Sequence, residues 1–134
     1  LLYDVREKRS KPRLDDKTLT SWNAIMLKGY ADAYKALDND EYLTAATRNA
    51  EFIAEKLWHS DGHLWRTYKN NTVKIKGFLE DYAHTADAFI TLYEATLEEK
   101  WHFMLNNLQI IALKIFTMTN SSFSLILQLK KNSL

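Results

Sequence analysis

The chain has 134 residues, enough to bury the hydrophobic core of one domain or of part of one. Its 18 lysines and arginines nearly balance 17 aspartates and glutamates, and the net charge is +1. This balance argues against a nucleic-acid-binding protein, which usually carries a strongly basic face. A local basic run over residues 6–13 is followed at once by Asp15 and Asp16, and we interpret it as a solvated segment.

The sequence contains no cysteine, which excludes disulfides, thiol catalysis and cysteine-ligated zinc within the chain. Charged residues interrupt the start, so we expect no signal peptide, and no stretch approaches the roughly 20 apolar residues of a membrane span. Three glycines and one proline favour long helices over a many-turned β architecture. We therefore predict an all-α, cytoplasmic protein without a membrane or nucleic-acid partner.

The first half of the chain predicts an irregular entry segment and then a helical hairpin. Residues 1–19 are expected to be irregular, because Pro12 disfavours helical backbone in the residue before it. Thr20 or Ser21 is a natural N-cap for a first helix over residues 21–37. Its apolar residues recur with helical spacing and are expected to face the core: Trp22, Met26, Tyr30, Ala33, Tyr34 and Leu37.

A polar turn over residues 38–40 can cap a second helix, expected over residues 41–58. Four alanines there predict a close helix–helix approach: Ala45, Ala46, Ala50 and Ala54. A third helix is predicted over residues 79–96 and a fourth over residues 98–116. Residues 118–134 are expected to extend the fourth helix or to fray, after a turn at residues 120–122. The expected organisation is one partial domain, with hairpins over residues 20–58 and 79–117, a loop over 59–78 and a tail over 118–134.

The connecting loop over residues 59–78 has the pattern of a small β-hairpin. Asp61 and Gly62 signal a turn, and residues 63–68 alternate weakly, as a short strand would. Residues 69–71 read as the reversal and residues 73–76 as the returning strand. Loops of this length are often functional.

The chain repeats itself at an offset of 59 residues. Tyr34-Lys35-Ala36 precedes the first inter-helix turn, and Tyr93-Glu94-Ala95 precedes the second. The same offset places Tyr42 on Trp101. A helical hairpin that recurs in this way is typical of a stacked or circular array of hairpins.

In such an array the first and third helices run in the same direction, so their leading ends share one rim. The loop over residues 59–78 must lie on that rim too. This rim gathers four carboxylates, which we identify as candidate catalytic residues: Asp15, Asp16, Glu80 and Asp81. Paired carboxylates can divide acid and base roles when their environments separate their pKa values. The candidate binding residues could stack on, or hydrogen-bond to, a sugar or other polyol: Lys17, Trp22, Asn23, Trp65, Arg66, Tyr68 and Tyr82.

Each of these assignments has a structural alternative. Glu80 and Asp81 lie in the first turn of a helix, where the helix dipole stabilises an acid by roughly 0.3–1 kcal/mol. His59 and His63 are four residues apart, but Gly62 breaks any helix between them, so helical spacing does not bring the two imidazoles together. We therefore predict no metal site and no cofactor.

Three motifs, in the same order and spacing, resemble those of a known family. They are Lys8-Arg9 through Pro12, Asp15-Asp16-Lys17, Leu19-Thr20 and Trp22-Asn23; then Asp61-Gly62, Leu64 and Arg66; and then Gly77-Phe78-Leu79-Glu80-Asp81-Tyr82-Ala83. Over about residues 3–101 the chain resembles the helical region of the thioredoxin-domain-containing family that includes the spermatogenesis-associated thioredoxin-like proteins.

The resemblance implies a six-hairpin (α/α) toroid, similar to glycoside hydrolases and the N-acylglucosamine 2-epimerase group, of which this chain is about a third. It also implies a thioredoxin-like domain in the parent protein. The sequence after Trp101 departs from the family pattern, and we interpret it as a truncated or frame-shifted product.

Three hypotheses follow. In the first, the chain is part of a toroid that binds a carbohydrate or polyol and is active only in its parent. In the second, it is a non-catalytic scaffold that binds a protein partner, regulates a thioredoxin-like module or self-associates through exposed helix faces. In the third, the chain alone has no function and is unstable.

Overall fold

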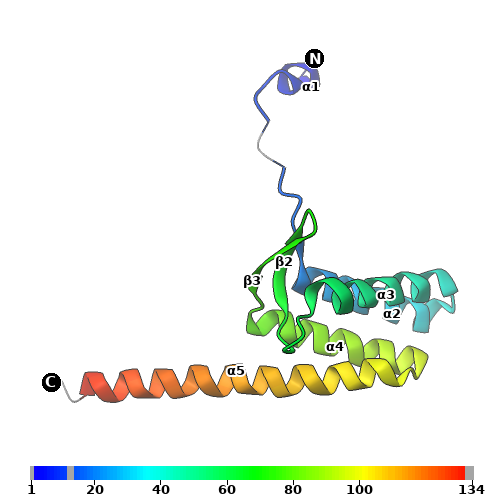
Figure 1. Ribbon diagram of the computed structural model, residues 1–134. Helices are drawn as coiled ribbons and strands as arrows, with labels where there is room; N and C mark the ends of the chain where they lie inside the picture. The colour runs from blue at the N-terminus through cyan, green and yellow to red at the C-terminus, as the bar shows by residue number, and fades with distance from the viewer. Residues whose placement is uncertain (1, 12–13, 132–134) are drawn as a thin grey trace.

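The computed structural model describes residues 2–11 and 14–131, with the backbone alone for residues 115, 116 and 118–131. Helices α2 (Thr20–Leu37), α3 (Asp40–Phe52), α4 (Leu79–Thr96) and α5 (Glu99–Lys131) form the body, and a π-helical turn η1 (Ile53–Leu57) continues α3. Strands β1 (Thr18–Leu19), β2 (Trp65–Lys69) and β3 (Thr72–Lys76) form an antiparallel sheet in the order β1-β2-β3. A short helix α1 (Leu2–Glu7) lies apart from this body (Figure 1). The predicted class of antiparallel helical hairpins with a short β-hairpin is confirmed.

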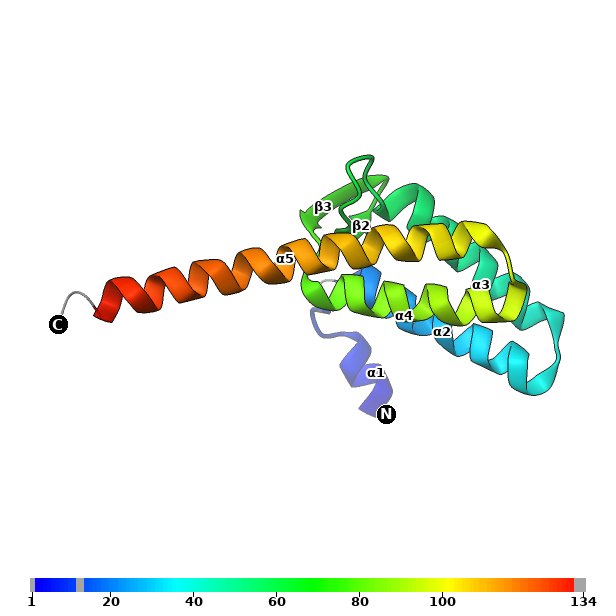
Figure 2. The same ribbon diagram turned by 90° about the horizontal axis from the view of Figure 1, so that it is seen from below.

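The 59-residue repeat sets the register in which the parallel helices α2 and α4 pack together. Figure 2 shows α4 lying between α2 and α5. Lys28 Nζ is 2.7 Å from Asp87 Oδ2, and Lys35 Nζ is 3.3 Å from Glu94 Oε2, and each pair is separated by 59 residues. Equivalent positions of the two repeats therefore lie side by side along α2 and α4. These pairs are exposed, so they fix register more than they add stability.

Both hairpins turn in the same way. Asp38 and Leu97, at equivalent positions, end α2 and α4 in left-handed backbone with φ of 52° and 56°. Their amides donate to the carbonyls of Tyr34 and Tyr93 at 2.8 and 2.7 Å. After the first turn the side chain of Asn39 accepts from the Glu41 amide and caps α3, so the predicted polar turn is confirmed.

The aromatic packing across each hairpin repeats as well. Tyr30 stacks against Tyr42 with ring centroids 6.4 Å apart, and Phe89 packs against Trp101 at 5.5 Å. Each member of the second pair lies 59 residues after its counterpart. The repeat seen in the sequence is therefore a repeat of tertiary contacts and not only of composition.

The core lies along a different face of α2 from the one that the spacing predicted. Trp22 and Met26 are 70% and 55% exposed, whereas Ala24, Leu27 and Ala31 are fully buried. The physical reason is the close approach of α2 to both α3 and α4, which small residues permit and large side chains prevent. Ala46 and Ala50 of α3 are fully buried too, so two of the four alanines expected to allow a close approach lie in the core.

The loop after η1 forms the expected β-hairpin. Asn70 and Asn71 have φ of 48° and 56°, the two left-handed residues that a tight two-residue turn requires. Residues 1–19 are not irregular throughout, because residues 2–7 are helical and Thr18–Leu19 add a third strand. Leu19 pairs with Thr67, and this pairing brings the entry segment to the hairpin.

The fourth helix is longer than predicted. α5 continues without a break from Glu99 to Lys131, so the turn expected at residues 120–122 is wrong. Neither glycine nor proline lies in that stretch, and asparagine and serine lower helix propensity only slightly. In the described part of the chain, no helix combines the length and apolarity needed to cross a membrane.

Candidate functional site

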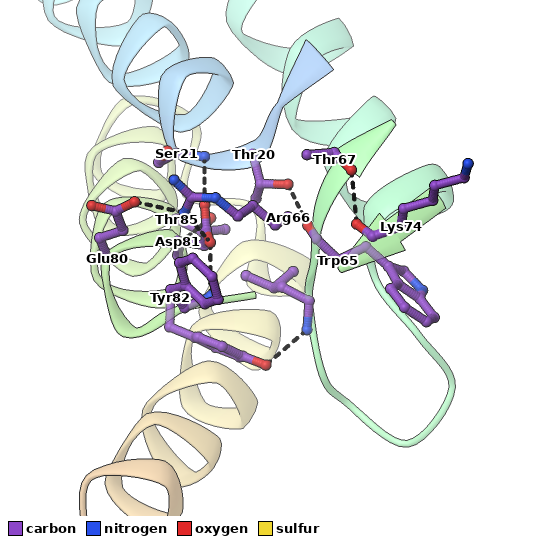
Figure 3. A network of polar contacts seen from close by, with 12 residues as sticks. Thr20, Ser21, Trp65, Arg66, Thr67, Lys74, Glu80, Asp81, Tyr82 and Thr85 are labelled. Carbon is purple, nitrogen blue, oxygen red and sulfur yellow. Dashed lines mark hydrogen bonds and ion pairs between the residues drawn. The ribbon is translucent and has the colours of Figure 1, made fainter. Parts of the chain in front are cut away.

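A single buried carboxylate joins the leading ends of α2 and α4 (Figure 3). Asp81, in the first turn of α4, is fully buried, and its Oδ1 accepts a hydrogen bond from the Ser21 amide at 3.1 Å. Its Oδ2 accepts from the Phe78 amide at 2.8 Å and from Arg66 Nη1 at 3.0 Å. The leading ends of the two helices therefore share one rim. The expected cap of α2 by its own Thr20 or Ser21 is wrong, because Leu19 is the N-cap and Asp81 of the neighbouring helix accepts from the Ser21 amide.

Arg66 of β2 links this buried carboxylate to a solvent-facing one. Its Nη1 lies 2.6 Å from Glu80 Oε1, and its guanidinium carbon lies 4.4 Å from the centre of the Phe78 ring. The hydrogen bond to Glu80, together with the charge of Asp81, raises the pKa of Arg66 above its usual value. The Glu80 side chain is 53% exposed. Of the two acids in this first turn, Glu80 is the one that a dissolved molecule could reach.

Two predicted binding residues hold the fold at the rim. Tyr82 is buried, and its hydroxyl accepts from the Leu64 amide at 3.0 Å. Burial raises the pKa of this phenol. Asn23 donates from Nδ2 to the Leu19 carbonyl at 2.8 Å, which closes the first turn of α2. Both side chains therefore anchor the loop and the helix start.

The other carboxylate pair lies beside the β-hairpin. Asp16 forms an ion pair with Lys69, whose hydrogen bond is the main reason that the pKa of Asp16 is lowered. Lys17 Nζ is 3.4 Å from Asp15 Oδ1. Both residues line an open hollow of about 560 Å³, whose described lining is Leu14, Asp15, Lys17, Thr67, Lys69, Asn70, Thr72 and Lys74. Since neither Glu80 nor Asp81 belongs to this lining, the two carboxylate pairs do not share the hollow.

Three aromatic residues among the predicted binding residues lie in three different places. Trp22 is exposed on α2. Tyr68 packs edge-on against Phe52 at 5.3 Å and donates its hydroxyl to Asn71 Oδ1 at 2.7 Å. Trp65 packs against the rings of two histidines, 59 and 63. The described lining of the hollow contains no aromatic ring.

Sequence reasoning missed the hairpin side chains that line the hollow. Thr67 and Lys74 are cross-strand partners, and Thr67 Oγ1 donates to the Lys74 carbonyl at 2.8 Å. The reversal predicted at residues 69–71 already implied that these two strands are neighbours. The sequence did not predict strand β1, whose pairing with β2 brings Lys17 to the same hairpin.

Comparison with known proteins identifies relatives and a shared architecture. No family model matches the chain. Spermatogenesis-associated protein 20 of Homo sapiens is 35% identical over 109 residues, an alignment that covers 75% of this chain and 14% of that protein. The chain thus spans about a seventh of the length of this relative.

Two solved structures share the fold. Cellobiose 2-epimerase from Spirochaeta thermophila has a TM-score of 0.69 at 16% identity, with 73% of this chain and 28% of the epimerase covered. The GH76 alpha-mannanase of Bacteroides thetaiotaomicron has a TM-score of 0.67 at 20% identity, with 75% and 28% covered. At these identities the likeness shows the fold alone, which is that of hairpins in an (α/α) toroid.

Proposed function

The chain is homologous to a segment of spermatogenesis-associated protein 20, and from this premise we propose that it supplies two neighbouring hairpins of a toroid that binds a carbohydrate or polyol. Fold kinship with a cellobiose epimerase and a mannanase supports the ligand class only by analogy. A cytoplasmic setting, with which the absence of cysteine is compatible, stays part of this proposal.

The hollow beside the β-hairpin is the observation that carries the proposal. A polyol hydroxyl both donates and accepts hydrogen bonds, so its site needs donors and acceptors close together. The lining supplies ammonium donors from Lys17, Lys69 and Lys74 and a carboxylate acceptor from Asp15. Its volume of about 560 Å³ lies within the range of small-ligand sites, roughly 300–1,000 Å³.

Binding is proposed for this chain in preference to catalysis. Acid and base roles require two carboxylates that face one bound molecule, and the two predicted pairs do not line one hollow. Asp81 already accepts three hydrogen bonds, so it has little capacity left for a ligand. Of the two predicted catalytic residues in α4, Glu80 is the accessible one, and a reaction beside it in the parent toroid would need a second carboxylate from elsewhere.

Titration calorimetry with cellobiose and with an α-linked mannobiose tests the proposal, in the protein that carries this chain. We expect saturable binding of at least one disaccharide and a loss of at least tenfold in affinity in the double variant Lys17→Ala/Lys74→Ala. Lys56→Ala removes an exposed lysine of η1, away from the hollow, and is the matched control. Equal affinity in the double variant and in the wild type would rule out this hollow.

A protein-binding scaffold is the second candidate, and exposed apolar side chains favour it. Trp22, Ile25 and Met26 are each at least half exposed on α2. A partner such as a thioredoxin-like module, or a second copy of the chain, could cover them. Sedimentation of the wild type and of Ile25→Lys distinguishes these outcomes: a dimer that the variant abolishes indicates self-association.

A further inference from the structure

The turn between η1 and β2 brings two histidines and an aspartate together. Trp58 and Leu64 form an isolated antiparallel bridge. Inside it, the His59 amide donates to the His63 carbonyl at 2.9 Å, and the Gly62 amide donates to the His59 carbonyl at 2.9 Å. Residues 59 and 63 are therefore opposite each other across a tight reversal, with residue 61 at its tip. Helical spacing does not bring these histidines together, but the register of this hairpin turn does.

The side chains of this turn converge on one point. The two imidazole rings are stacked, with centroids 4.5 Å apart and an angle of 19° between their planes. Asp61 Oδ1 lies 2.9 Å from His59 Nδ1 and 2.5 Å from His63 Nδ1. A candidate ligand atom from each of the three residues lies within 4.8 Å of the others.

The environment of His63 favours metal binding through its Nδ1 atom. His63 Nε2 is buried and has no hydrogen-bond partner among the described residues. Trp65 packs edge-on against His63 with ring centroids 4.8 Å apart, and this contact limits rotation of the imidazole. His63 is thus held with Nδ1 as the nitrogen that faces Asp61, 2.5 Å from its Oδ1.

We propose that His59, Asp61 and His63 bind a divalent transition-metal ion of the zinc or nickel class, through both Nδ1 atoms and a carboxylate oxygen. Two imidazoles and one carboxylate are a donor set that such ions favour, and a water molecule would complete a four-coordinate shell. The site is distinct from the hollow beside the β-hairpin and does not depend on sugar binding.

The geometry needs only a small adjustment. Ligand atoms about 2.1 Å from a tetrahedral ion are about 3.4 Å from one another. The separations of 2.9 and 2.5 Å from Asp61 Oδ1 must therefore widen by less than about 1 Å. The candidate ligand atoms of the two histidines, which lie within 4.8 Å of each other, must approach by at most about 1.4 Å. Both His59 and Asp61 have well-exposed side chains, so they can rotate outward without disturbing the core. The alternative is a turn held by hydrogen bonds alone, in which Asp61 Oδ1 accepts from the His63 amide and contacts both rings while His59 Nδ1 accepts from the Asp61 amide.

Calorimetric titration of the full chain with zinc chloride, and separately with nickel chloride, tests the proposal. We expect one ion per chain and at least a tenfold loss of affinity in His59→Ala, which removes a side chain that is 43% exposed. Asp61→Asn keeps an oxygen for the His63 amide but loses the charged ligand, and it should weaken binding as well. His84→Ala removes an exposed histidine of α4 and should leave binding unchanged.

X-ray absorption of the zinc-loaded chain supplies a readout of the ligand set. Two imidazole nitrogens in the first coordination shell would support the assignment. Absence of saturable binding by the wild type, or equal affinity in His59→Ala and the wild type, would overturn it and leave a hydrogen-bonded turn.

Discussion

Asp81 should be the most sensitive polar residue of the fold. Replacing it with alanine removes the acceptor for two backbone amides, Ser21 and Phe78, and one of two partners of Arg66. Loss of one partner from a buried ion pair costs about 3–5 kcal/mol, and a buried unpaired amide costs about 1–3 kcal/mol. Because Arg66 keeps Glu80 and water can reach Phe78, we expect about 3 kcal/mol.

The asparagine variant isolates the role of the carboxylate. In Asp81→Asn one oxygen remains for the Ser21 amide, but the new NH₂ group faces the Phe78 amide and Arg66, which are donors themselves. We expect a loss of about 2 kcal/mol, close to that of alanine. Glu80→Gln is the matched control, because Glu80 is exposed and an exposed ion pair contributes at most about 1 kcal/mol.

Urea unfolding followed by far-UV circular dichroism at pH 7 measures these differences by linear extrapolation. A net stability of about 5–15 kcal/mol makes a loss of about 3 kcal/mol visible as a large shift of the midpoint. The reasoning would be refuted if Glu80→Gln cost as much as Asp81→Asn, or if Asp81→Asn stayed within about 0.5 kcal/mol of the wild type.

Three further perturbations probe the loop that carries both proposed sites. Tyr82→Phe leaves the buried Leu64 amide without its acceptor and should cost about 1–3 kcal/mol in the same urea assay. Gly77→Ala places a Cβ 2.9 Å from the Leu64 carbonyl oxygen, so we expect a lower thermal midpoint, whereas Gly29→Ala, which meets nothing within 4 Å, should not lower it. Hydrogen bonds from the His63 amide and from His59 lower the pKa of Asp61 to about 2, below its unfolded value of about 3.9. Its stabilising contribution is therefore present above about pH 4 and lost as the pH falls toward 2, and Asp61→Asn should flatten that part of the stability curve.

Periodicity and the repeat made the helices predictable. The sequence predicts the third helix over residues 79–96, and these are the observed bounds of α4. The 59-residue offset gave the parallel packing of α2 and α4, because equivalent residues of stacked repeats must face each other. The buried face of α2 was missed since spacing alone cannot tell a stripe of large residues from the stripe of small ones that permits close packing.

The site was harder to predict because its key bonds are tertiary. An acid in the first turn reads as a cap of its own helix, and nothing local indicates that Asp81 also accepts from the Ser21 amide of α2, 60 residues away. The two histidines show the same limit, since their proximity follows from a reversal that a helix-only test of spacing does not consider.

Parallel packing of α2 and α4 explains why one buried acid stands between their leading ends. Two parallel helices bring their positive ends together, and a carboxylate between them offsets that repulsion while it satisfies amides of both. The first repeat has no such carboxylate, because its position equivalent to Asp81 is the exposed Trp22. Asp81 is therefore specific to the junction of the two hairpins. Its oxygens accept from the Ser21 and Phe78 amides and from Arg66, so Asp81 holds the two helix ends together and Glu80 is the acid of this turn that stays accessible to a ligand.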